Sequence, residues 1–204
     1  MGQGMQLAIR KWWETVHLDS VKQFLTNTGL KQYIEKFDIA SELEKAKTIL
    51  EIGVGTGLAV REMAALGKKV SVLEVSDEGR RKVVDSVEAA YFPAIMSNMP
   101  SDYFDLIISH LVVQHMNAVD VSEQFGHVLR ALKPSGVFVF QFANAKRTKD
   151  YVMGEEHEKK GGMIYSLLEM RSLILAYAAV ITRAKCYPIP NSIIRHYFMK
   201  IKKG

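Results

Sequence analysis

From about residue 48 onward, short apolar runs alternate with stretches in which apolar residues recur every three or four positions. The short runs predict buried strands, and the periodic stretches predict amphipathic helices. The strands are expected at Thr48–Ile52, Val70–Val75, Asp105–Ser109 and Val137–Phe142. The helices between them are expected at Leu58–Leu66, Asp77–Ala89 and Val119–Leu132. This alternation predicts an α/β fold with right-handed crossovers and a mostly parallel sheet.

The two ends of the chain depart from this alternation. Residues 1–46 show no strand pattern, and Leu30–Phe37 and Ser41–Lys45 have a helical tendency, so a helical extension is expected there. At the other end, Ser166 and Glu169 form a capping box that begins a helix reaching about Ala178. Two final strands, Val180–Tyr187 and Ile194–Lys202, are joined by a short connection, which favours an antiparallel pair.

Between these parts lies the charged stretch Asn144–Ile164, which ends in Gly161-Gly162. A loop of this length is usually a functional lid or an insertion, and we expect it to close over a substrate together with the N-terminal extension. The length of 204 residues predicts a single domain, with 1–46 as the extension, 47–142 as a cofactor-binding half and 143–204 on the substrate side.

Composition narrows the class of protein. The longest clean apolar run, Leu173–Ile181, has nine residues, whereas a membrane-spanning helix needs about 20, so no membrane span is expected. Cys186 is the only cysteine and no secretion signal is seen, which favours a cytoplasmic location. The net charge of +5 suits an acidic or phosphorylated substrate, but the basic residues form only two clusters. Solvated surface charge is therefore favoured over nucleic-acid binding.

The most informative segment is the turn that follows the first predicted strand. Gly53, Gly55 and Gly57 stand at alternate positions, and a predicted helix follows. Glycines let the backbone turn sharply and approach a ligand, and the N–H groups of the helix N-terminus attract an anion. The dinucleotide pattern G-x-G-x-x-G would need a glycine where Leu58 stands, which disfavours a nicotinamide oxidoreductase.

With Glu51 ahead of the glycines, the segment resembles the first motif of the class I S-adenosylmethionine-dependent methyltransferases, acid-x-G-x-G-x-G. The resemblance covers about residues 46–142. It implies a Rossmann-like seven-stranded, mostly parallel sheet with an antiparallel last strand and helices on both faces. It also implies S-adenosyl-L-methionine as cofactor, with Glu51, Gly53, Gly55 and Gly57 in its binding site.

Further expectations follow along the same motifs. Glu74, 17 residues after Gly57, ends the second strand, where a carboxylate accepts hydrogen bonds from both ribose hydroxyls. The family's acid near the adenine is missing ahead of Pro100, so Ser97 or Asn98 is expected to serve the adenine, although a simple turn into Pro100 explains Asn98 equally well. Ser109, which ends the fourth predicted strand, completes the expected cofactor-binding residues.

The sequence after Ser109 bears on the acceptor. Ser109-His110-Leu111-Val112 differs from the Asn/Asp-Pro-Pro-Tyr/Phe motif of enzymes that methylate DNA bases, and it lacks the carboxylate of magnesium-dependent relatives, so no metal is expected. His110 and His115 are the candidate general bases, with a packed histidine as the alternative for each. Pocket-lining or packing roles are open for five residues of the two flanking segments: Trp12, Trp13, His17, Met163 and Tyr165.

These observations favour methyl transfer to a small-molecule acceptor such as a sugar, a quinone precursor or another metabolite. Two alternatives stay open: methylation of a protein or RNA, and a non-catalytic nucleoside-binding partner subunit. The acceptor, the methylated atom and the oligomeric state do not follow from the sequence.

Overall fold

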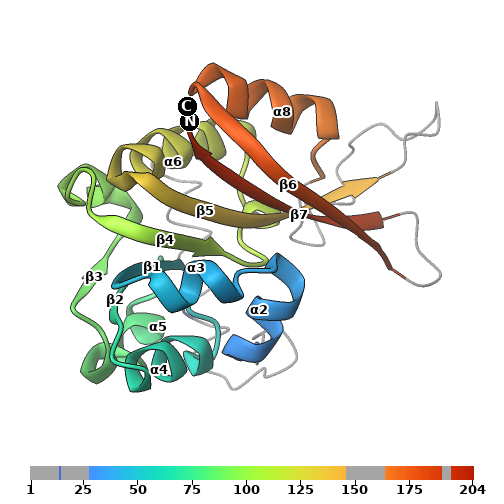
Figure 1. Cartoon of the computed structure of the whole chain (residues 1–204). Helices are drawn as coiled ribbons and strands as arrows, with labels where there is room; N and C mark the ends of the chain where they lie inside the picture. Colours follow the sequence, from blue (N-terminus) through green and yellow to red (C-terminus); the bar gives the residue numbers. More distant parts are fainter. Residues whose placement is uncertain (1–13, 15–27, 146–163, 190–193) are drawn as a thin grey trace. The chain divides into compact units, whose positions relative to one another are not determined.

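The computed structural model describes residue 14 and residues 28–145, 164–189 and 194–204 (Figure 1). The chain divides into two compact units, Met1–Met99 and Pro100–Gly204. The predictions for Trp12, Trp13, His17 and Met163, and most of the predicted lid Asn144–Ile164, lie outside the described residues. The division into an extension, a cofactor-binding half and a substrate side stays a prediction.

Seven strands form one sheet with the order β3-β2-β1-β4-β5-β7-β6. Their bounds are β1 Thr48–Ile52, β2 Lys69–Leu73, β3 Ala89–Tyr91, β4 Phe104–Ser109, β5 Leu132–Ala145, β6 Ala179–Pro188 and β7 Ile194–Lys203. Pairing is parallel from β1 to β3 and between β4 and β5, whereas β7 runs antiparallel to both of its neighbours. The predicted α/β class and the antiparallel final pair are therefore confirmed.

In the first unit, β1 is buried along its whole length, as expected for a central parallel strand. The helices of this unit are α2 Leu30–Phe37, α3 Ala40–Lys45, α4 Leu58–Ala65 and α5 Asp77–Arg81. Helix α4 packs against β2, and α2 packs against α4. The two helices expected before β1 are confirmed, with α3 beginning one residue earlier than predicted.

The predicted helix Asp77–Ala89 is wrong beyond its first turns. Ser76 caps α5 as expected, because its hydroxyl accepts a hydrogen bond from the Gly79 N–H. The helix ends at Arg81, a 3₁₀ turn η1 spans Val84–Ser86, and the unpredicted strand β3 follows. Pairing of β3 with the edge of β2, with Leu73 opposite Tyr91, overrides the helical preference of its alanines.

In the second unit, α6 Ala118–Ala131 packs against β5, and α8 Leu167–Ala176 packs against β6. Asn117 caps α6, and the predicted capping box of Ser166 and Glu169 begins α8. Strand β5 begins earlier than expected, directly after α6. Four phenylalanines of α6 and β5 pack together in the core of this unit in edge-on, tilted and stacked pairs: Phe125, Phe138, Phe140 and Phe142.

No helix in the described ranges is both long enough and apolar enough to cross a bilayer.

Candidate functional site

The turn between β1 and α4 has an unusual backbone that depends on glycine. Gly53, Gly55 and Gly57 have φ values of 77°, 52° and 75°, the left-handed region that other residues rarely adopt. The Gly53 N–H donates to the carbonyl of Leu73 at 2.9 Å, and the Gly57 N–H donates to that of Val54 at 2.7 Å. These bonds hold the turn against the end of β2 and direct the chain into α4.

Glu74 fixes the other side of this turn. Its buried carboxylate accepts the Val54 N–H at 2.9 Å through Oε2 and the Ser76 N–H at 2.9 Å through Oε1. Burial raises the pKa of Glu74, whereas these two N–H donors and the positive charge of Arg80 oppose the rise. Each carboxylate oxygen has a second lone pair, so Glu74 keeps the capacity to accept hydrogen bonds from a ligand.

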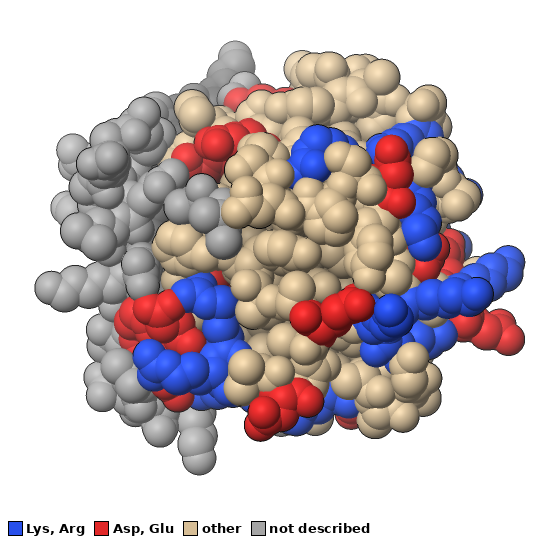
Figure 2. Space-filling model, turned by 90° about the vertical axis from the view of Figure 1, so that its left-hand side faces the viewer, with Lys and Arg blue, Asp and Glu red and all other residues tan. Residues whose placement is uncertain are grey.

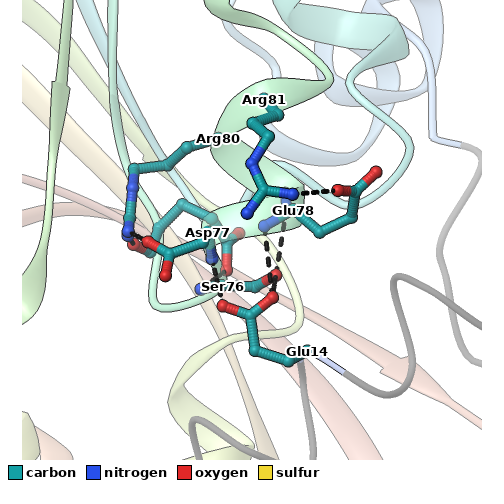
Figure 3. Close-up of polar contacts among 8 residues, drawn as sticks. Glu14, Ser76, Asp77, Glu78, Arg80 and Arg81 are labelled. Atoms are coloured by element: carbon teal, nitrogen blue, oxygen red, sulfur yellow. Dashed lines mark hydrogen bonds and ion pairs between the residues drawn. The ribbon is translucent and has the colours of Figure 1, made fainter.

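Glu14 accepts hydrogen bonds from the segment that follows Glu74. Figure 3 shows its carboxylate pointing at the start of α5, where it accepts the Ser76 hydroxyl at 3.0 Å and the Glu78 N–H at 3.2 Å. It also accepts the Asp77 N–H. A carboxylate at this end of a helix satisfies N–H groups that have no partner within the helix. Residue 14 therefore contacts the segment directly after β2.

Glu51 lies beneath the glycine turn, at the end of β1, and is 1% exposed. The Tyr33 hydroxyl, from α2, donates to its Oε1 at 2.6 Å. Its Oε2 is buried and has no hydrogen-bond partner among the described residues. Burial raises the pKa of Glu51 to about 8, with the nearby Glu74 adding to the rise and the Tyr33 hydrogen bond opposing it.

Ser97 and Asn98 lie on the 3₁₀ helix η2, Pro93–Asn98, which follows β3. Both are exposed. The contact of Ser97 and Asn98 with an adenine stays a prediction; η2 belongs to the same unit as the glycine turn.

The second unit contains the other predicted site residues. Ser109 ends β4, is fully buried, and its hydroxyl has no hydrogen-bond partner among the described residues. His110 follows, is 5% exposed, and its ring stacks on Phe198 of β7 at 6.0 Å between centroids. Leu111 then adopts φ 60°, a strained conformation for a leucine. Its N–H donates to Gln141 Oε1 at 2.9 Å.

His115 ends the 3₁₀ turn η3, Val113–His115, two residues before the α6 cap. It is half-buried, and its Nε2 lies 3.4 Å from Gln114 Nε2. Gln114 also contacts Gln141, whose amide donates to Gln114 Oε1 at 3.5 Å. Gln141 therefore contacts both ends of the turn that carries the two histidines.

Three residues of this site were not identified from the sequence. Gln141 interrupts an apolar strand, and a buried polar residue in such a run needs partners, which is a usable signal. Tyr33 shares the apolar face of α2 with Phe37, so its pattern indicates only packing. Glu14 has no local signal, because all its partners lie more than 60 positions away.

Within the described ranges, no group of three or more His, Cys, Asp or Glu side chains could hold a metal ion. The arrangement instead offers a backbone turn with left-handed glycines, two buried carboxyl groups beside it, and a separate histidine-bearing turn. The glycine turn and its carboxyl groups suit the binding of a nucleoside-containing ligand, and the histidines of the second unit suit acid–base chemistry.

Comparison with protein families identifies the fold. Residues 21–179 match the family model described as a methyltransferase domain, which is more than half of the chain. The chain belongs to the methyltransferase domain family. The family membership expected from the glycine motif is thereby confirmed.

The curated relatives of this chain have low sequence identity to it. A ubiquinone biosynthesis O-methyltransferase from Paramagnetospirillum magneticum is 31% identical over 125 residues, covering 54% of this chain and 47% of that protein. A cyclopropane-fatty-acyl-phospholipid synthase from Escherichia coli is 28% identical over 148 residues, covering 71% of this chain and 36% of that protein. The chain thus spans less than half the length of these curated relatives.

Among solved structures, the 1,6-didemethyltoxoflavin-N1-methyltransferase of Burkholderia thailandensis has a TM-score of 0.73 at 13% identity. The match covers 100% of this chain and 91% of that one. That structure holds 1,6-didemethyltoxoflavin and S-adenosylhomocysteine. At this identity the likeness shows the fold, which is the Rossmann-like fold expected from the sequence.

Proposed function

We propose that the chain transfers the methyl group of S-adenosyl-L-methionine to a small-molecule acceptor. The observation that carries the proposal is the turn from Gly53 to Gly57, with its left-handed glycines and the carboxyl groups of Glu51 and Glu74 beside it. The family match and the methyltransferases among the relatives support it.

The residues of this turn fit such a cofactor. Glu51 has a buried oxygen without a donor among the described residues, and a ligand N–H group would satisfy it. Glu74 is held by two backbone N–H groups and has lone pairs left for ribose hydroxyls. We extend the binding site to the glycines and, as expected from sequence, to Ser97, Asn98 and Ser109.

The bound cofactor supplies a methyl group already activated by a sulfonium. The protein then has to orient the acceptor, exclude water and, for a hydroxyl or amine acceptor, take up a proton. His115 suits the role of base better than His110, because His115 is half-buried whereas His110 is almost fully buried and stacked on Phe198.

For the acceptor we favour a quinone precursor or another small metabolite. The relative that methylates an oxygen in ubiquinone biosynthesis supports this class of acceptor. A cytoplasmic location and the lack of a nucleic-acid partner stay predictions.

Titration calorimetry with S-adenosylhomocysteine and with NAD tests the cofactor. We expect S-adenosylhomocysteine to bind and NAD to give no heat of binding, while tight NAD binding alone would contradict the proposal. Incubation of the protein with methyl-labelled S-adenosylmethionine and a panel of phenols, sugars and amines then tests the acceptor. Label in a protein or RNA substrate, with none in the panel, would overturn the small-molecule assignment.

A further inference from the structure

Among the described residues, only one of the two oxygens of the Glu51 carboxyl group has a hydrogen-bond partner. Tyr33 donates to Oε1 at 2.6 Å, and the buried Oε2 has no partner among the described residues. A carboxylate oxygen buried without a donor is costly, whereas a protonated carboxyl group carries no charge. The geometry therefore favours the neutral acid, and burial accordingly raises the pKa of Glu51 to about 8.

Two groups act on Glu51, one from α2 and one from the end of β2, and a third group acts on the second of these. Tyr33 faces it from α2, and its pKa is raised by burial and by Glu51, so it stays a hydroxyl donor at neutral pH. Glu74 faces it from the end of β2, and its charge disfavours a second negative charge nearby. Arg80 of α5 acts on Glu74 and lowers the pKa of that group. No cation acts directly on Glu51 among the groups that shift its pKa.

We propose that binding of the cofactor releases a proton from Glu51, and that Tyr33 is the positioning residue that controls this release. The inference rests on the proposed function, because the cofactor and its demethylated product both carry an ammonium group. When this group donates an N–H to Oε2, the Glu51 carboxyl group loses its proton to the buffer. The ammonium keeps its own proton, and Tyr33 continues to donate to Oε1.

A purely structural role for this contact predicts a different result. If the Tyr33–Glu51 hydrogen bond only ties α2 to β1, Glu51 keeps its proton when the cofactor binds. Loss of the bond would then lower stability but would leave the proton balance of binding unchanged. Counting protons therefore separates the two roles.

The experiment is calorimetric titration of the full chain with S-adenosylhomocysteine in phosphate, HEPES and Tris, whose ionisation enthalpies differ. The dependence of the binding heat on the buffer gives the number of protons released. We expect about one proton per bound ligand at pH 6.5, falling to about a quarter at pH 8.5, where most Glu51 is already ionised. The wild-type protein alone suffices for this measurement.

Three variants test whether the proton released on binding comes from Glu51. Glu51→Gln should bind without buffer-dependent heat at either pH. Tyr33→Phe keeps the ring that packs on Phe37 but removes the donor, so the release should persist to higher pH and affinity at pH 7 should fall several-fold. Tyr177→Phe, which loses a comparable hydroxyl bond to the Ser122 carbonyl at 2.6 Å, should behave as wild type.

The outcomes separate the inference from the proposed function. Binding of S-adenosylhomocysteine with the same heat in all buffers overturns the inference and leaves the function standing. Undiminished release in Glu51→Gln, or a release in Tyr33→Phe that ends at the same pH as in wild type, also overturns it. Failure of wild-type protein to bind the ligand at all contradicts the proposed function itself.

Discussion

At the scale of single residues, Glu74 combines a structural contact with a binding role. Glu74→Ala should weaken S-adenosylhomocysteine binding by about 1.5–3 kcal/mol, the range for hydrogen bonds to a charged group. Glu74→Gln should lose less, because one acceptor oxygen remains. Calorimetry measures both, with Glu78→Ala as the control, since Glu78 pairs with Arg81 rather than with the glycine turn. Unchanged affinity for S-adenosylhomocysteine in a folded Glu74→Ala variant would show that Glu74 does not bind the ribose.

Gln141 is the residue that holds the histidine-bearing turn. Gln141→Leu leaves the strained Leu111 N–H without its acceptor, so the free energy of unfolding should fall by about 1–3 kcal/mol. The rate of methyl transfer should also fall if this turn contributes the general base. Denaturant unfolding measures the loss.

Gln124→Leu is the matched control for this variant. Gln124 is also buried in the second unit, but its amide nitrogen has no partner among the described residues, so the change should cost less. Equal losses in the two variants would contradict the role given to Gln141.

At the scale of elements, Gly57 before α4 and Gly67 after α4 differ in why glycine is needed. Gly57 and Gly67 have similar φ values, 75° and 73°, but a Cβ on Gly57 would lie 2.5 Å from the buried Val83 Cγ1, whereas one on Gly67 meets nothing within 4 Å. Gly67→Ala should therefore cost only the left-handed strain, about 1–2 kcal/mol, and leave ligand binding intact. Gly57→Ala should cost more and also weaken S-adenosylhomocysteine binding.

Thermal unfolding and calorimetry of the two alanine variants compare these effects. Equal stability loss in both variants, with binding intact in both, would show that the crowding at Gly57 is relieved without consequence for the site.

At the scale of the whole molecule, the surface formed by the described residues carries charges of both signs. On the face drawn in Figure 2, basic and acidic side chains of the described residues lie interspersed. Exposed lysine and arginine pair with acids, as in Lys69–Glu88 at 3.4 Å and Arg81–Glu78 at 2.8 Å. This distribution agrees with the interpretation of the net charge of +5 as solvated surface charge.

The buried acids make global stability depend on pH. Because the pKa of Glu51 is about 8 in the folded chain, against 4.5 for an ordinary glutamate, the folded state binds more protons between these values. The free energy of unfolding should therefore fall as pH rises from about 5 to 8, by at most about 1.4 kcal/mol per pH unit from this group. Glu74, whose pKa is also raised, adds in the same direction.

Denaturant unfolding of the cofactor-free protein at a series of pH values measures this slope. Glu51→Gln should flatten it, whereas Tyr177→Phe should leave it unchanged. A wild-type slope that Glu51→Gln does not reduce would mean that Glu51 is already ionised throughout this range.

The sequence alone determined the strand–helix order, the glycine turn and the caps at Ser76 and Ser166, because these depend on neighbours within a few positions. The class of fold followed from this local information. The boundaries of α5 and the strand β3 did not, since pairing with β2 outweighed local propensity.

Only the tertiary structure decided the partners of the site residues. Tyr33 reaches Glu51 across 18 positions, Glu14 reaches Ser76 across 62, and Gln141 reaches Leu111 across 30. Nothing in the local pattern encodes these distances, because each contact forms only when separate elements pack together. The charge state of Glu51 has the same origin: burial and the neighbouring Glu74, both products of packing, set its pKa.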